Sequence, residues 1–170
     1  MFRKYIPKMI WCFILIHFCV YPTYVFLTKS DVVTLLPSLQ ERHKWITPNI
    51  LEIILRNSKK NNLDVRFICE VIKAESNGKS NATSCVGAMG YMQLMPCHTP
   101  AIHRNDPSVL YRPILNIEIG TAYLKWCLDK AKGNKMIALK NYNSGPSSSY
   151  YNWEYIAKIL NVDNYLVTSL

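Results

Sequence analysis

Acidic residues and regular strand-like alternation are both scarce in this sequence. Only 11 aspartates and glutamates accompany 20 lysines and arginines, which gives a formal net charge of +9. No segment alternates apolar and polar residues with a period of two, so we predict an all-α fold. The basic residues are scattered, with no run longer than Lys59-Lys60 and no nucleic-acid-binding motif. We therefore expect no nucleic-acid partner and interpret the charge as a general attraction to an anionic polymer or surface.

The first 29 residues have the pattern of an export segment. Arg3, Lys4 and Lys8 precede an apolar run from Met9 to Leu27. A basic flank before such a run is typical of a secretory signal peptide or of an N-terminal membrane anchor. No clear small-residue cleavage site follows, so both alternatives remain open. In either case we expect the rest of the chain to be exported to the periplasm or cell envelope, attached to the inner membrane if the segment is an anchor.

The cysteines lack the spacing of a metal site. No two of them form a C-x-x-C motif and no histidine pair accompanies them, so we expect neither a metal nor a cofactor. Cys85 and Cys97 flank a glycine-containing loop, and we predict that they form a disulfide if the protein is exported. Cys69 and Cys127 fall in helical patterns and are expected to be small buried residues.

The remainder of the chain divides into a predicted linker and one helical domain. Residues 30–46 show no clear periodicity and are predicted to be a linker, whereas 47–165 are predicted to form the domain. Thr47, Asp64 and Asn116 are predicted to cap the first three helices, because each precedes a run of helical apolar spacing. The predicted helices are 48–57, 65–75, a long helix from Asn116, 136–142 and 153–160.

Glu75 lies at the end of an apolar helical pattern. It follows Ile68 by seven positions, Val71 by four and Ile72 by three, which places its carboxyl on the apolar face of its own helix. Desolvation there raises the pKa of a carboxyl, as a general acid acting at neutral pH requires. The spacing alone favours a simpler alternative, a helix-terminal glutamate that turns into solvent.

Short motifs around Glu75 and downstream of it favour the catalytic alternative. In chain order they are Glu75-Ser76, the loop from Ala82 to Gly90, Tyr91-Met92-Gln93, the segment Asn116–Leu124, and Tyr142-Asn143 with Gly145-Pro146. Together they resemble the lytic transglycosylases, the goose-lysozyme-like enzymes that cut peptidoglycan glycan strands. Each motif alone is weak evidence, but their order and separation match the family over about residues 60–160.

The resemblance implies a lysozyme-like helical domain in which Glu75 is the sole acid and base. It also implies a set of substrate-binding residues: Ser76, Ser84, Gly87, Met92, Gln93, Tyr142, Asn143 and Tyr155. Several of these have an equally simple structural interpretation. Gly87 can be part of an ordinary surface turn, while Met92 and Tyr142 can be core residues.

Three positions depart from the family pattern. Asn141 replaces the usual alanine before Tyr142, Tyr91 replaces a leucine, and Gly78 stands where an aromatic residue is common. None of these changes removes the acid, but they alter the expected walls of the substrate groove. The segment Cys97–Pro113 matches poorly.

The resemblance also implies a reaction. No second aspartate or glutamate lies in any matched motif, whereas ordinary glycosidases use two carboxyl groups. The family cleaves the β-1,4 bond between N-acetylmuramic acid and N-acetylglucosamine and closes a 1,6-anhydro ring, so the expected partner is the peptidoglycan glycan strand. Alternatives are a goose-type-lysozyme-like muramidase that hydrolyses the bond, or a non-catalytic peptidoglycan-binding component of a secretion or phage assembly. A basic membrane-bound regulator is a further alternative.

Overall fold

The computed structural model describes residues 29–103 and 105–160. The predicted signal peptide or anchor lies outside the described residues, apart from Lys29, and so do residues 161–165 of the predicted domain. Within the described part, no helix is both long and apolar enough to cross a membrane.

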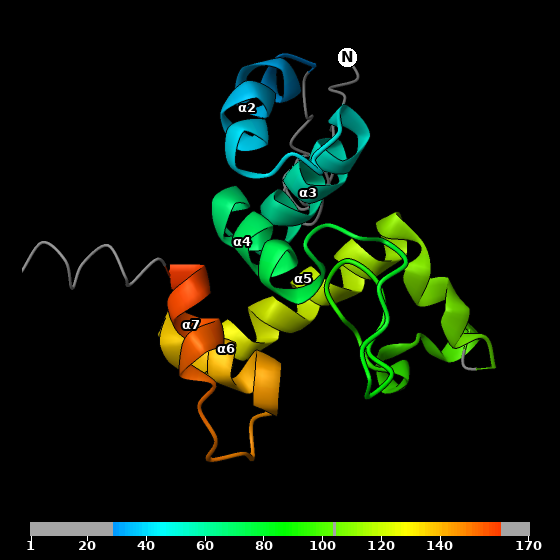
Figure 1. The fold of residues 1–170 in the computed structure, drawn as a ribbon, viewed down its shortest axis with the longest axis vertical. Helices are drawn as coiled ribbons and strands as arrows, with labels where there is room; N and C mark the ends of the chain where they lie inside the picture. Colours follow the sequence, from blue (N-terminus) through cyan, green and yellow to red (C-terminus); the bar gives the residue numbers. More distant parts are fainter. Residues whose placement is uncertain (1–28, 104, 161–170) are drawn as a thin grey trace, which may run out of the picture.

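Six α-helices and three short 3-10 helices form the described part of the chain (Figure 1). The α-helices are α2 (Lys29–Arg42), α3 (Pro48–Asn61), α4 (Val65–Ser76), α5 (Pro113–Lys130), α6 (Lys135–Ser144) and α7 (Trp153–Leu160). The 3-10 helices are η1 (Pro96–His98), η2 (Ala101–His103) and η3 (Pro107–Tyr111). Apart from isolated bridges in one loop, these residues form no β-structure, so the all-α prediction is confirmed.

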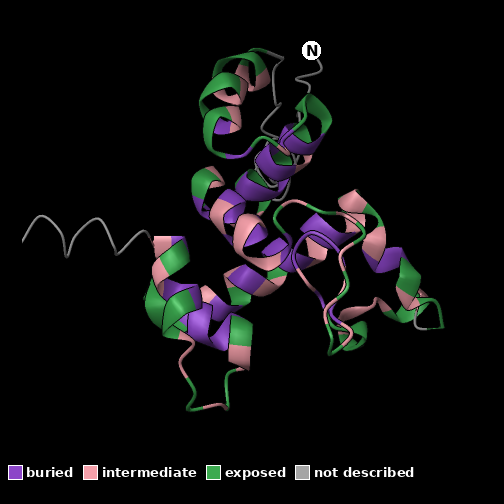
Figure 2. Ribbon diagram, viewed as in Figure 1, coloured by how far each residue is buried: buried purple, intermediate pink, exposed green. Residues whose placement is uncertain are grey.

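Helix α4 lies at the centre of the fold and packs against α3 and α7, while α5 packs against α3 and α6. The buried face of α4 includes Phe67, Ile68, Val71 and Ile72, the positions that the helical periodicity predicts. Buried residues concentrate where these helices meet, and exposed residues lie on their outer faces (Figure 2).

Two predicted helix starts are confirmed by their capping bonds. Thr47 Oγ1 accepts a hydrogen bond of 3.3 Å from the Ile50 amide, and Asp64 Oδ1 accepts one of 2.8 Å from the Phe67 amide. Such caps satisfy amide groups that the first helical turn leaves without partners. The last two predicted helices are also present, although α6 extends beyond both predicted ends.

The start predicted for the long helix is wrong. Helix α5 begins at Pro113, whose fixed φ and missing N–H suit a first helical position. Asn116 therefore lies inside the helix, where its side chain is fully buried.

The predicted linker is also wrong, because residues 29–42 form helix α2. Pro37 lies within this helix and weakens the helical signal. Tertiary contacts decide the outcome: Leu39 is buried in the core, and Val32, Leu35 and Leu36 pack against it.

The predicted Cys85–Cys97 disulfide is absent, and both cysteines are free and exposed. In the loop between them, Met89 pairs with Thr83 on one side and with Leu94 on the other. Cys69 and Cys127 are free and buried, as expected.

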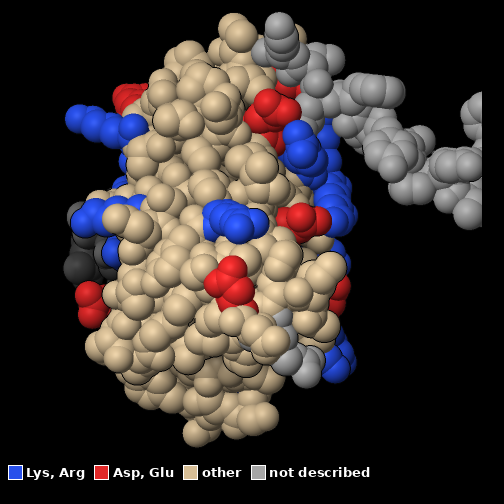
Figure 3. All heavy atoms as spheres, turned by 90° about the vertical axis from the view of Figure 1, so that its right-hand side faces the viewer, with Lys and Arg blue, Asp and Glu red and all other residues tan. Residues whose placement is uncertain are grey.

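Charged side chains are interspersed on the face shown in Figure 3. Lysines and arginines lie near acidic residues there, and uncharged residues form most of that surface. The described ion pairs include Lys60 with Glu118 at 2.7 Å and Arg56 with Glu52 at 3.0 Å.

Candidate active site

Glu75 lies in the last turn of α4. The helix ends at Ser76, because Asn77 and Gly78 both adopt left-handed backbone conformations with φ of 52° and 73°. The Glu75 side chain is partly buried. Burial raises the pKa of its carboxyl to about 7, although the Tyr155 hydroxyl and the Lys158 ammonium act in the opposite direction. A carboxyl of this kind can hold a proton near neutral pH and also release it.

Tyr155 on α7 contacts the acid directly. Its hydroxyl donates a hydrogen bond of 2.6 Å to Oε1 of Glu75. The Asn152 side chain caps the start of α7 by accepting from the Tyr155 amide at 3.1 Å. Burial, and then the nearby Glu75 charge, raise the pKa of Tyr155 well above its usual value, so its hydroxyl remains a donor. The structure thus brings together two predicted site residues that are 80 positions apart in the sequence.

Ser76 holds the end of α4 against the following loop. Its buried hydroxyl lies 2.8 Å from the Tyr91 carbonyl, to which it donates, and 3.3 Å from the Ile72 carbonyl. A hydroxyl has one proton, and the shorter distance assigns it to Tyr91. Ser76 therefore positions the chain next to the acid, and its hydroxyl is already engaged within the protein.

The loop after α4 is a compact meander closed by its own hydrogen bonds. Ser84 Oγ accepts from the Ala88 amide at 2.9 Å, and the Gly87 amide donates to the Ser84 carbonyl at 3.0 Å. Gly87 has a φ of 85°, with open space where a Cβ would be. This positive φ favours glycine. The open space beside its Cα leaves room for a ligand.

Gln93 closes the same loop from the other side. It has a φ of 47°, and its Nε2 donates to the carbonyls of Gly90 at 3.0 Å and Ala82 at 3.3 Å. No side chain of the described residues donates to its Oε1 in this structure. The amide oxygen is thus free to accept a hydrogen bond, and its expected role toward the sugar stays a prediction.

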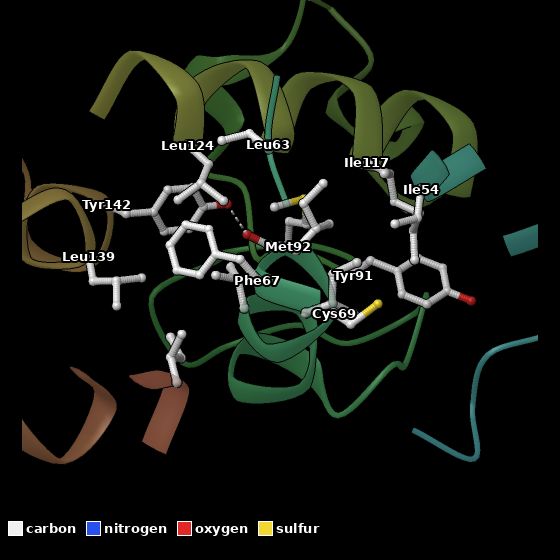
Figure 4. Close-up of a cluster of buried hydrophobic side chains, with 14 of the residues drawn as sticks. Ile54, Leu63, Phe67, Cys69, Tyr91, Met92, Ile117, Leu124, Leu139 and Tyr142 are labelled. Atoms are coloured by element: carbon white, nitrogen blue, oxygen red, sulfur yellow. Dashed lines mark hydrogen bonds between the residues drawn. The ribbon is translucent and has the colours of Figure 1, made fainter. Parts of the chain in front are cut away.

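Met92 and Tyr142, two residues expected to bind substrate, are buried. Met92 is fully buried and packs so closely on α5 that a Cβ at Gly120 would lie 2.4 Å from its sulfur. Tyr142 is largely buried too, and its hydroxyl donates to the Met92 carbonyl at 2.9 Å (Figure 4). These contacts fit the core interpretation of both residues, and their expected role toward the substrate stays a prediction. Asn143, the next residue, is exposed.

Comparisons with known proteins show which family this sequence matches. The model of the transglycosylase SLT domain family matches residues 52–161, well over half of the chain. The chain belongs to this family.

Two curated relatives of this SLT domain are similar in sequence over part of their length. A transglycosylase of Enterobacteria phage PRD1 is 38% identical over 102 residues, which cover 60% of this chain and 36% of that protein. Membrane-bound lytic murein transglycosylase E of Buchnera aphidicola subsp. Baizongia pistaciae is 37% identical over 95 residues, 51% of this chain and 42% of that protein. The chain therefore spans less than half of the length of either relative.

Solved structures show the same fold for this SLT domain. An inactive variant of the lytic transglycosylase Slt from Pseudomonas aeruginosa superposes with a TM-score of 0.52 at 27% identity, over 66% of this chain and 21% of that one. The 70-kDa soluble lytic transglycosylase from Escherichia coli has a TM-score of 0.54 at 22% identity, over 77% of this chain and 23% of that one. The predicted lysozyme-like fold is thereby confirmed.

Sequence reasoning missed the role of Asn116 in this SLT domain. Its Oδ1 accepts from the Met92 amide at 2.8 Å, and its Nδ2 donates to the carbonyls of Met89 at 2.9 Å and Leu110 at 2.6 Å. One side chain thus joins α5 to the active-site loop and to η3. No local signal revealed this role, because an asparagine before an apolar helical run is equally typical of a helix cap.

A row of aromatic rings leads from Tyr142 to the surface of the SLT domain. The Tyr123 ring centroid lies 5.2 Å from that of Tyr142, 4.8 Å from that of His98 and 5.7 Å from that of Trp126.

Among the described residues, no group of three or more histidine, cysteine or acidic side chains could hold a metal ion.

Proposed function

We propose that this SLT domain is a peptidoglycan lytic transglycosylase. In this proposal it cleaves the β-1,4 bond between N-acetylmuramic acid and N-acetylglucosamine and leaves a 1,6-anhydro end on the muramic acid. The observation that carries the proposal is the Glu75 carboxyl, whose pKa is raised to about 7 by burial and whose Oε1 accepts from Tyr155.

A single carboxyl is sufficient for this reaction if it acts twice. In the first step the protonated Glu75 gives its proton to the glycosidic oxygen, and the bond from that oxygen to C1 of the muramic acid breaks. The N-acetyl carbonyl of the same sugar stabilises the electron-poor C1. In the second step the Glu75 carboxylate removes the proton of the C6 hydroxyl, and O6 bonds to C1. The acid is regenerated and no water is consumed.

Tyr155 supports both steps. Its hydrogen bond stabilises the carboxylate that forms after the first proton transfer, and it fixes which oxygen of Glu75 remains available to the substrate. Three other described carboxylates are engaged elsewhere: Glu70 faces Arg42 and His43, Glu118 pairs with Lys60, and Asp64 caps α4. Their engagement supports the anhydro reaction over hydrolysis in which one of these three carboxylates positions water.

Export and partners belong to the same proposal. The N-terminal basic and apolar pattern supports transport of the domain to the cell envelope, where its polymeric substrate lies. The similarity to a protein of phage PRD1 is compatible with a role in a phage or a secretion machine and equally with a role in wall turnover.

Product analysis tests the proposal. Purified peptidoglycan is digested with the full chain, and the released muropeptides are separated and weighed. We expect products that are lighter by one water than those of a muramidase and that have no reducing end. Reducing muropeptides would instead establish the goose-type-lysozyme-like alternative. Binding to peptidoglycan without any release would establish the non-catalytic one.

A further inference from the structure

The segment between α2 and α3 lies along the catalytic helix α4. At its start, Arg42 Nη2 lies 3.2 Å and His43 Nε2 lies 3.5 Å from Oε1 of Glu70, in the middle of α4. At its end, Ile46 is fully buried, and its carbonyl accepts from Gln40 Nε2 at 2.6 Å. Between these fixed points, the Trp45 ring lies over the end of α4. The family model begins only at residue 52, so this segment is outside the matched region.

Trp45 occupies the space in which a side chain at position 78 would begin. A Cβ built on Gly78 would lie 2.1 Å from Cγ of Trp45 and 2.3 Å from its Cδ2, far inside contact distance. Gly78 also has a φ of 73°, which few residues other than glycine adopt readily. The indole therefore packs directly on the backbone three residues after Glu75.

The same ring contacts the other chain segment that holds the acid. The centroids of the Trp45 and Tyr91 rings are 6.0 Å apart, and the Tyr91 carbonyl accepts the hydroxyl proton of Ser76. His43 packs edge-on against Trp45 at 5.8 Å. Trp45 thus fills the corner between the end of α4 and the start of the Tyr91-Met92-Gln93 turn.

We propose that Trp45 is a positioning residue for Glu75: its ring fixes the last turn of α4 against the Tyr91 segment and keeps water away from that turn. Only the kinetic consequences of this role of Trp45 rest on the proposed function. It assigns part of the active site to a segment that precedes the domain matched by the family.

A specific consequence follows for the titration of Glu75. Burial is the largest cause of its raised pKa, so a change that admits water to this turn lowers that pKa toward its ordinary value. A pKa lower by about one would reduce the protonated fraction at pH 7 roughly fivefold and leave it nearly unchanged at pH 5. A loss of folded protein would instead reduce activity by the same factor at both pH values.

The first experiment measures the Glu75 carboxyl by NMR titration in the full chain. The variants are Trp45→Ala and the milder Trp45→Leu, which carries the test if the alanine variant does not fold. Trp45→Phe is the conservative control. The indole N–H has no hydrogen-bond partner among the described residues, so phenylalanine removes no hydrogen bond. We expect a lower pKa in the alanine or leucine variant and a pKa near that of the native protein in the phenylalanine variant. An unchanged pKa in a folded leucine variant would overturn the proposal.

The second experiment compares kcat at pH 5 and pH 7 on purified peptidoglycan. We expect Trp45→Leu to lose about fivefold at pH 7 and little at pH 5, with KM nearly unchanged. Equal losses at both pH values would overturn the positioning role. If the native protein releases no muropeptides, the proposed function fails, whereas the NMR titration still decides the role of Trp45.

A thermal unfolding cycle tests the contact itself. Gly78→Ala and Gly133→Ala both place alanine at a positive φ, of 73° and 84°, but only Gly78 has neighbouring atoms in the way. We expect the larger decrease in Tm for Gly78→Ala, and we expect the difference between the two to shrink when Trp45 is replaced by alanine, which removes Cγ and Cδ2 and keeps only Cβ, at 2.6 Å. A difference of unchanged size would show that the Trp45 ring does not fill this space.

Discussion

The hydroxyl of Tyr155 lies 2.6 Å from Oε1 of Glu75 and donates a hydrogen bond to it. This bond joins helix α4, which carries Glu75, to helix α7, which carries Tyr155. Hydrogen bonding to the ionised form lowers a carboxyl pKa, whereas burial raises it, and for Glu75 burial has the larger effect. The balance leaves the pKa near neutrality.

Replacing Glu75 by glutamine should abolish turnover while leaving binding largely intact. Glutamine has nearly the same shape, but it can neither donate the proton nor accept it back. Loss of a general acid and base costs on the order of a hundred- to ten-thousand-fold in rate. Muropeptide release and co-sedimentation with insoluble peptidoglycan are the measurements. Glu154→Gln, on the exposed side of α7, is the matched control and should retain activity.

The native protein and Glu75→Gln should differ in how the free energy of unfolding depends on pH. Glu75 ionises near 4.5 in the unfolded chain but near 7 in the folded protein. Between these values the folded state holds the additional proton, so its stability falls as the pH rises and levels off above about 7. Relative to Glu75→Gln, the native protein should lose roughly 1–3 kcal/mol of unfolding free energy over this range. Urea denaturation from pH 4 to 8 measures the difference, and parallel curves would contradict the raised pKa.

Removing the Tyr155 hydroxyl should move the titration of Glu75 upward. In Tyr155→Phe the carboxylate loses a donor, so its pKa should rise above about 7, and the alkaline limb of the kcat profile should shift to higher pH. The maximal rate should fall on the order of tenfold, because a hydrogen bond to a charged group contributes about 1.5–3 kcal/mol. Tyr150→Phe, at a ring that is 64% exposed, is the control. A shift to lower pH would be inconsistent with the structure.

Asn116→Asp should destabilise the fold strongly at neutral pH. The aspartate carboxylate would face the carbonyl oxygens of Met89 and Leu110, to which the asparagine amide now donates. An uncompensated buried charge costs on the order of 3 kcal/mol or more. The loss should be smaller at acidic pH, where the carboxyl is protonated and can donate once. Urea denaturation at pH 4 and pH 7 measures it, with Asn105→Asp at an exposed position as the control. A similar loss in both variants would contradict the assigned network.

Local signals were reliable where they were strong. Asp64 before the apolar spacing of Phe67, Ile68, Val71 and Ile72 predicts both the start of α4 and the face that it buries, and both are confirmed. Asn116 shows the limit of such reasoning. A capping residue and a buried network residue look the same in one sequence, and the choice depends on Pro113 and on partners from distant segments.

Residues 29–42 and the cysteines show the same limit. Helix α2 has weak periodicity and an internal proline, and contacts of its apolar side chains with the core override this weak propensity. Cys85 and Cys97 are close in sequence, but both are free and exposed in the structure. Separation along the chain does not determine which loop residues meet.

The sequence by itself determined the helical class and the family, and it singled out Glu75 as the proposed acid, because periodicity and ordered short motifs are local properties. Only the tertiary structure decided how that acid is tuned. The raised pKa of Glu75 comes from burial by other helices, its donor Tyr155 arrives from α7, and the space beside Gly78 is filled by Trp45 from outside the family match. Such contacts join residues that are distant along the chain, and they form only when packing brings those residues together.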